Sequence, residues 1–251
     1  MASMPRPQEI IYPESDGQPM ADNTKQCNWI ETIKGGLEGI FENRPDVFVA
    51  GNLLWYPVEG KPKIRAAPDA MVAFGRPKGD RGSYRQWVEG NIAPQVVFEI
   101  LSPGNNLPEM EFKRRFYERY GVQEYYIYNP DNFMLTGWLR QGRKLKSITE
   151  MNGWKSPLLD IHFELDGPNG ELNIYDSEGR RFSTYLVVYK ERKQAEQRAE
   201  QERQRAEQER QRAEQAEVRV TQAEQEREQE RQRAEKLLAR LRAEGINLDD
   251  L

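Results

Sequence analysis

Pro94-Gln95-Val96-Val97-Phe98-Glu99-Ile100-Leu101 is apolar on both of its alternating faces, a pattern typical of a central strand buried on both sides. One charged residue, Glu99, stands in the middle of this run. An ionised carboxylate without a partner is costly in such surroundings, so Glu99 must be protonated, paired or bound to a cation. The stretch therefore predicts a buried sheet and a carboxyl group that needs a companion.

Two residues elsewhere in the chain are candidate companions of Glu99. Asp69 opens a second apolar run, residues 70–74, which is a predicted neighbouring strand. Lys113 lies on a predicted helix that begins at about residue 107 and ends at Gly121. Helical side chains lean toward the helix N-terminus, so Lys113 is directed back toward the end of the Glu99 strand. Two acids and one lysine are the minimum set for metal-assisted cleavage of a phosphodiester.

Each of these residues also has a purely structural interpretation. Asp69 can cap a turn, and Glu99 can pair with Lys113 as a buried ion pair that holds no metal. Taken singly, each residue favours its structural interpretation, and only the three together favour a nuclease-type site.

The remaining pattern predicts a mixed α/β fold. A helix capped by Asp22 or Asn23 presents Ile30, Ile33 and Leu37 at helical spacing on one face. Short strands are expected at residues 46–50, 53–56, 122–128, 133–139, 145–148, 158–165 and 172–175. A strand-helix-strand unit in the middle, with hairpins outside it, indicates a mixed sheet flanked by helices rather than a doubly wound sheet.

Composition divides the 251 residues into three parts. Residues 1–22 are rich in proline and predict an extended arm. Residues 23–189 are long enough for one folded domain. Residues 190–251 form a charged helical tail that cannot make a hydrophobic core of its own. A single cysteine, no apolar leader and no long apolar run predict a cytoplasmic protein without a membrane span.

The loop from Gly75 to Gly90 carries four basic residues with Tyr84 and Trp87 among them. The candidate phosphate contacts in it are Arg76, Lys78, Arg81 and Arg85. A solvated surface loop is the plain alternative, and the formal net charge of −4 gives the whole chain no general attraction for nucleic acid.

The central part of the chain resembles the Uma-type restriction endonucleases, a family with the restriction-endonuclease-like, PD-(D/E)XK fold. The resemblance covers about residues 30–185. The pieces that carry it are Pro68-Asp69, Phe98-Glu99-Ile100-Leu101-Ser102-Pro103, Lys113 and residues 117–127, which read YERYGVQEYYI.

This resemblance implies a metal-dependent DNA endonuclease. Asp69 and Glu99 match the Mg²⁺ ligands, with Mn²⁺ as a substitute, Lys113 matches the catalytic lysine, and Glu109 matches an accessory acid. Two positions depart from the superfamily pattern. Leu101 stands where the lysine usually follows the strand acid, so the lysine has moved to the helix, and no upstream acid is recognisable as a third ligand, for which Glu31 is a weak candidate.

The charged tail keeps a seven-residue repeat, with QERQRAE at residues 201–207, 208–214 and 229–235. The seam of this repeat is mostly alanine, interrupted by Glu202, Glu209, Glu230 and Arg227. It predicts either a weak homo-oligomer through a coiled coil or a single charge-stabilised helix, and the leucines near residue 237 favour the oligomer.

Two functions therefore stand before the structure is considered. One is an endonuclease that hydrolyses DNA through two carboxylates and a lysine. The other is a catalytically inactive scaffold that keeps the nuclease fold and binds a partner through its helical tail. Metal binding by Asp69 and Glu99 distinguishes the two.

Overall fold

The computed structural model describes residues 10–15, 17, 21–105 and 107–243. The chain divides into two compact units, residues 1–188 and 189–251. The first unit holds every strand of the described residues together with α1 (Thr24–Ile40) and α2 (Leu107–Tyr120). The second unit is formed by most of α3 (Tyr185–Ala243).

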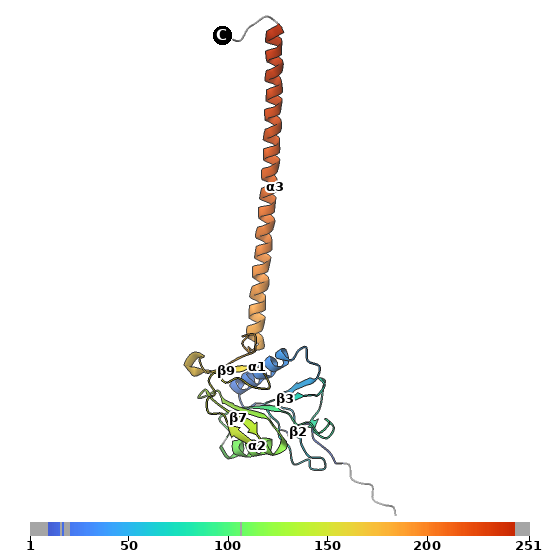
Figure 1. Ribbon diagram of the computed structural model, residues 1–251, viewed down its shortest axis with the longest axis vertical. Coiled ribbons are helices and arrows are strands. Elements are labelled where there is room, and N and C mark those ends of the chain that lie inside the picture. The colour runs from blue at the N-terminus through green and yellow to red at the C-terminus, as the bar shows by residue number, and fades with distance from the viewer. Residues whose placement is uncertain (1–9, 16, 18–20, 106, 244–251) are drawn as a thin grey trace, which may run out of the picture. The chain divides into compact units, whose positions relative to one another are not determined.

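A six-stranded mixed sheet forms the centre of the first unit (Figure 1). Its strands, in spatial order, are β1 (Val47–Ala50), β3 (Ala70–Phe74), β5 (Val96–Ile100), β6 (Glu124–Asn129), β7 (Met134–Gln141) and β8 (Lys144–Ser147). Among these six strands, only β5 and β6 pair in parallel, and α2 provides the crossover between them. The predicted mixed α/β fold with flanking helices and a long C-terminal helix is confirmed.

Strand β5 is the buried strand that its sequence predicts, since all five of its residues are buried. Its neighbours are β3 on one side and β6 on the other. Alternation along β5 sends Val96, Phe98 and Ile100 into one core layer and Val97 into the other. Glu99 follows the same alternation and faces the layer of Val97.

The two core layers lie on opposite faces of the sheet, each under one helix. Residues Ile30, Ile33 and Leu37 of α1 pack in the layer of Phe98. The other layer contains side chains of α2, namely Met110, Phe116 and Tyr117. In β3, Met71 and Ala73 face the α2 layer, so alternation points Asp69 to the same face as Glu99.

Helix α1 begins where its capping residue predicts. The Asn23 side chain accepts a hydrogen bond from the backbone N–H of Gln26 at 2.9 Å. Gly36 leaves space for an aromatic ring, because a Cβ atom there would lie 2.1 Å from the ring of Phe182. The glycine that weakens the helix is therefore required for packing.

Two small sheets complete the first unit, and both are shorter than the expected strands. Strands β2 (Trp55–Tyr56) and β4 (Tyr84–Arg85) pair in parallel, and β9 (His162–Glu164) pairs antiparallel with β10 (Asn173–Tyr175). The expected strand at residues 158–165 is confined to β9, because Asp160 adopts a left-handed φ of 57°. A short 3₁₀ helix, Pro168–Gly170, precedes β10.

The proline-rich N-terminal segment is described only in part, and its residues 1–9, 16 and 18–20 lie outside the description. The described part carries no helix or strand. Tyr12 packs edge-on against Tyr56, and Tyr56 donates a hydrogen bond to the Pro13 carbonyl at 2.6 Å. This stretch thus lies against the β2 region.

Helix α3 is 59 residues long, which confirms the predicted helix in the tail. Every described side chain from Val188 to Arg240 is exposed. Within the described residues, no helix has both the length and the apolar character needed to cross a bilayer.

Candidate active site

Glu99 lies at the centre of the site, on β5, with only 2% of its surface exposed. Its Oε2 atom is 2.8 Å from the Nζ atom of Lys113, and its Oε1 atom accepts a hydrogen bond from the Tyr117 hydroxyl. Lys113 and Tyr117 are four residues apart on α2 and therefore share one helix face. The buried carboxylate has its charge balanced and both of its oxygens bonded.

Asp69 lies directly before β3 and is also buried, with 8% of its surface exposed. Its Oδ2 atom accepts a hydrogen bond from the backbone N–H of Ile100 at 2.6 Å. This bond attaches the carboxyl group to the residue after Glu99. The structure therefore brings Asp69, Glu99 and Lys113 together at the junction of β3, β5 and α2.

Glu99 is close enough to Asp69 to affect the protonation of Asp69. Burial, followed by the negative charge of Glu99, raises the pKa of Asp69 to about 8, although the Ile100 N–H and the Lys113 charge act in the opposite direction. Without a further cation, Asp69 is therefore mainly protonated at neutral pH. Such a proton is the expected response of two adjacent buried carboxyl groups that share one lysine.

Lys113 and Tyr117 carry their protons at neutral pH. Burial lowers the pKa of Lys113, but the charge and hydrogen bond of Glu99 outweigh burial, and the net shift is upward. Burial, together with the charge of Glu99, raises the pKa of Tyr117 well above its usual value. Lys113 is thus a permanent positive charge, and Tyr117 is a neutral hydrogen-bond donor.

Tyr125 on β6 completes the buried side of the site. Its ring centroid lies 4.9 Å from that of Tyr117. Its hydroxyl is the one buried side-chain polar atom in the described part of the chain that has no hydrogen-bond partner. Burial, followed by the charges of Glu99 and Asp69, raises the pKa of Tyr125.

A second group of polar residues joins the start of α1 to the end of β5. Gln26 donates to the Ile100 carbonyl at 2.8 Å, and its side-chain oxygen accepts from the backbone N–H of Asp22 at 2.8 Å. The Ser102 hydroxyl donates to the Asp22 carboxylate. The Asp22 charge also raises the pKa of Asp69, which places a third acid near the pair.

Sequence reasoning did not assign these supporting residues to the site. Tyr117 had a signal, because it follows Lys113 by four residues on a predicted helix. Asp22 and Gln26 had none, since their position depends on how α1 packs against the sheet.

The two other acids considered from sequence lie differently. Glu109 accepts a hydrogen bond from the Asn105 side chain at 3.4 Å, and its charge contributes to the raised pKa of Lys113. Glu31 lies on α1 near Cys27, with 3.7 Å between Sγ and Oε1. Among the described residues, no hydrogen bond or ion pair joins Glu31 to the two buried acids.

The donor set of Asp69 and Glu99 fits a hard divalent cation. Mg²⁺ binds oxygen ligands, keeps several waters, and is often held by only one or two carboxylates together with substrate phosphates. Two adjacent buried carboxyl groups, one of which holds a proton at neutral pH, supply that set. In the described ranges, no cluster of three or more acidic, histidine or cysteine side chains forms a metal site made by protein ligands alone.

The basic loop is largely occupied by contacts within the protein. Glu89 receives Arg76 Nε at 2.9 Å and Arg81 Nε at 2.7 Å, and Arg81 also lies over the Phe48 ring. Lys78 donates to the Phe41 and Glu42 carbonyls. Arg85 is exposed on β4. Contact of these four residues with DNA remains a prediction.

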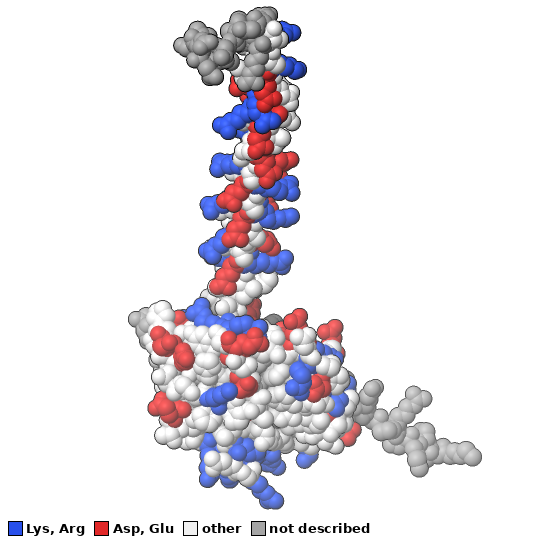
Figure 2. Space-filling model, turned by 45° about the horizontal axis from the view of Figure 1, so that its top comes forward, with Lys and Arg blue, Asp and Glu red and all other residues white. Residues whose placement is uncertain are grey.

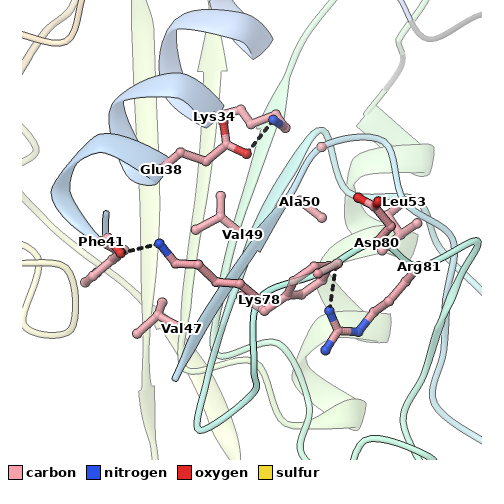
Figure 3. Close-up of a pocket in the computed structure, with 13 residues that line it drawn as sticks. Lys34, Glu38, Phe41, Val47, Val49, Ala50, Leu53, Lys78, Asp80 and Arg81 are labelled. Atoms are coloured by element: carbon pink, nitrogen blue, oxygen red, sulfur yellow. Dashed lines mark hydrogen bonds and ion pairs between the residues drawn. The ribbon is translucent and has the colours of Figure 1, made fainter. Parts of the chain in front are cut away.

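A groove of about 470 Å³ lies beside the edge strand β1. Figure 3 shows Lys34 and Glu38 on α1 above it and Lys78 extending across it toward Phe41. Asp69, Glu99 and Lys113 do not line the groove. One of its lining residues, Gly51, packs against the backbone of Asp69, because a Cβ atom there would lie 3.1 Å from the Asp69 carbonyl oxygen.

Comparison with known proteins gives a family and several solved structures. No curated protein matches the chain. A putative nuclease belonging to DUF820 from Anabaena variabilis, known from a crystal structure, is 14% identical with a TM-score of 0.41; the match covers 54% of this chain and 72% of that one. The family model of Uma2, described as a putative restriction endonuclease, matches residues 4–166. That match spans more than half of the sequence and includes every residue of the site, so this chain belongs to the Uma2 family of putative restriction endonucleases.

Proposed function

We propose that this protein is a metal-dependent DNA endonuclease whose site consists of Asp69, Glu99 and Lys113. The observation that carries the proposal is the meeting of the three side chains on one face of the sheet, with Lys113 bonded directly to Glu99. The membership of the chain in a nuclease family supports the same reaction class. Hydrolysis of a phosphodiester is chemistry that two acids and a lysine are suited to assist.

In this proposal, Asp69 and Glu99 hold the cation. A bound Mg²⁺, or Mn²⁺ in its place, makes a coordinated water more acidic and offsets negative charge on the phosphate oxygens. Asp69 would give up its proton on becoming a ligand, because the charge of the cation would oppose the burial and the Glu99 charge that raise the pKa of Asp69. Tyr117 keeps Glu99 in position through its hydroxyl.

Lys113 acts as a positive charge rather than as a base. Its raised pKa keeps the ammonium protonated at neutral pH, so it cannot accept a proton from the attacking water. It can orient that water by donating a hydrogen bond to it, and it can stabilise negative charge that develops on the phosphate. Glu109, one helical turn earlier, adds an acid beside the lysine.

The test is cleavage of supercoiled plasmid DNA by the full chain with Mn²⁺ or Mg²⁺. Asp69→Ala, Glu99→Ala and Lys113→Ala should each abolish cutting while circular dichroism reports a folded domain. Lys155→Ala, which removes an exposed lysine paired with Asp160, is the matched control and should cut normally. Full activity in all three site variants would refute the assignment.

The scaffold function remains the second candidate, and one observation favours it. Both oxygens of Glu99 already have protein partners, so the ion pair is complete without a metal. Calorimetric titration with Mn²⁺ separates the two candidates. An endonuclease should bind the ion, and Asp69→Asn should weaken binding at least tenfold; a scaffold should show no site that depends on Asp69.

A further inference from the structure

Helix α3 has an exposed, charged surface with a seven-residue repeat, and the proposed cleavage reaction gives this surface no role. The family match ends at residue 166, before the helix begins. Figure 2 shows acidic and basic side chains alternating along its length. Two series of residues form the seam of its seven-residue repeat. The first is Ala199, Ala206, Ala213, Val220, Arg227 and Ala234, and the second is Ala195, Glu202, Glu209, Ala216, Ala223, Glu230 and Leu237.

A parallel pair of these helices brings like charges together. In a parallel coiled coil in register, each seam residue faces its own copy. Glu202 would then face Glu202, and the same holds for Glu209, Glu230 and Arg227. The flanking positions do not compensate. Arg198 with Arg203, Arg205 with Arg210 and Glu191 with Glu196 are like-charged, and they are matched by three opposite pairs, Arg212 with Glu217, Arg219 with Glu224 and Glu226 with Arg231. An alanine seam buries too little apolar surface to offset these repulsions.

An antiparallel pair of the same helices removes the repulsions in the seam. Antiparallel packing places residues of the first series opposite residues of the second. With the centre of the pair between Glu214 and Gln215, Arg227 faces Glu202. Three alanine pairs also face each other, Ala206 with Ala223, Ala213 with Ala216 and Ala234 with Ala195. Glu209 faces Val220 and Glu230 faces Ala199, so neither acid meets a like charge across the seam.

The flanking charges select the same register. One flank pairs opposite charges throughout, and its pairs are Glu196 with Arg231, Arg203 with Glu224 and Arg210 with Glu217. On the other flank, Arg205 faces Glu226 and Glu191 faces Arg240, while Arg198 with Arg233 and Arg212 with Arg219 are like-charged. A shift by one heptad in one direction sets Arg203 against Arg231, and a shift in the other sets Glu196 against Glu224.

We propose that α3 binds a second copy of itself in the antiparallel direction, centred between Glu214 and Gln215. The partner is identified by charge complementarity. When a second copy of the helix runs in the opposite direction, most of its charged residues face residues of opposite charge. Every described side chain that the contact needs is exposed. Arg210 and Arg231 also contact Glu207 and Glu228 within the helix, and these weak surface pairs do not prevent contact across the dimer.

This arrangement determines where the two nuclease units of a dimer are attached. Each α3 is continuous with its folded unit at the Tyr185 end, and antiparallel pairing puts the two Tyr185 ends at opposite ends of the rod. A helix of 59 residues is about 88 Å long. Resting on the proposed function, this separation means that the two sites of one dimer act on different places rather than on both strands of one short site.

Site-directed cross-linking of the full chain tests the direction of pairing. The variants are Ala195→Cys and Ala234→Cys, each made with Cys27→Ser so that no other thiol is present. A disulfide-linked dimer should form when the two variants are mixed and oxidised, and neither variant should cross-link alone. Cross-linking of each variant by itself would show parallel pairing, and a mixture that stays monomeric in sedimentation would show no pairing; either result overturns the proposal.

A charge exchange tests the register by a separate measurement. Arg203→Glu and Glu224→Arg should each raise the dimer dissociation constant roughly tenfold, because each change acts twice in a symmetric dimer. The double variant should return it to the starting value. Lys190→Glu makes the same charge change on the outer face of the repeat and should have little effect; an equal weakening by this control would contradict the register. Neither test measures DNA cleavage, so its failure is distinguishable from failure of the proposed function.

Discussion

Acidic and basic residues pair in both units of the molecule, but the surroundings give the pairs opposite consequences. At the site, Glu99 is 2% exposed, and it pairs with Lys113 beside the buried Tyr117. On α3, the side chains of Glu207 and Arg210 are 49% and 76% exposed, so water screens their pairing. The comparison shows that burial, rather than the number of ion pairs, decides where a charge is able to do chemistry.

The largest contrast is expected in the pH dependence of stability. The folded pKa of Asp69, about 8, exceeds that of an unfolded aspartate, so the folded state binds the extra proton between about pH 4 and pH 8. The unfolding free energy should therefore fall as pH rises through this window, by up to about 1.4 kcal/mol per pH unit from this one group. Above pH 8 the slope from this group should vanish.

Urea denaturation of Asp69→Asn beside the wild type measures this term. The variant keeps an oxygen for the Ile100 N–H and has no proton to lose. It should match the wild type near pH 4 and exceed it by several kcal/mol at pH 8. Parallel stability curves for the two proteins would show that Asp69 has an ordinary pKa.

The next contrast concerns loss of one partner of an ion pair. Lys113→Ala leaves Glu99 buried without its cation and should cost about 3 kcal/mol of unfolding free energy. The double variant Glu99→Gln/Lys113→Met should recover most of that loss. On α3, Arg210→Ala is the exposed counterpart and should change stability by no more than about 0.5 kcal/mol. Equal losses at the two places would break the comparison.

Two tyrosines sharpen the contrast within the site itself. The Tyr117 hydroxyl donates to Glu99, whereas the Tyr125 hydroxyl has no partner among the described residues. Tyr117→Phe should therefore lower the unfolding free energy by about 2 kcal/mol and weaken Mn²⁺ binding about tenfold or more. Tyr125→Phe removes an oxygen that makes no bond and should be neutral or slightly stabilising. The reverse order of the two variants would mean that Tyr125 holds the carboxylate.

The smallest effect is expected from salt on the exposed charges of the tail. Raising the salt concentration from 0.1 M to 1 M shortens the screening length from about 10 Å to 3 Å. It should weaken pairing through α3 in sedimentation while leaving the buried Lys113–Glu99 contact intact. Pairing that strengthens with salt would point to an apolar contact instead.

The central part of the site was predictable because its signal is local. An acid inside an apolar strand, an acid opening the adjacent strand and a lysine on the next helix are each visible in the chain, and the alternation of β5 and β3 puts both acids on the face of α2. The structural positions agree with that pattern, while the roles of the residues remain a proposal.

What sequence could not supply depends on packing between distant segments. The Asp22, Gln26 and Ser102 group exists only because α1 packs beside the end of β5. The expected strand at residues 158–165 begins only at His162, and just before it the buried carboxylate of Glu124 accepts hydrogen bonds from the Ser156 hydroxyl and the Leu158 N–H. Neither contact has a periodic pattern to reveal it.

The space beside Gly36, which the ring of Phe182 fills, has a mechanical consequence. Phe182 is a buried side chain three residues before the start of α3, whereas Tyr185, the first residue of the helix, is exposed. A pulling force applied to α3 would therefore act on the contact between Phe182 and Gly36 before it reached any strand of the six-stranded sheet. Gly36→Ala would displace the Phe182 ring. It would lower the force needed to pull Phe182 out of the folded unit, and it would leave Asp69 and Glu99 unchanged.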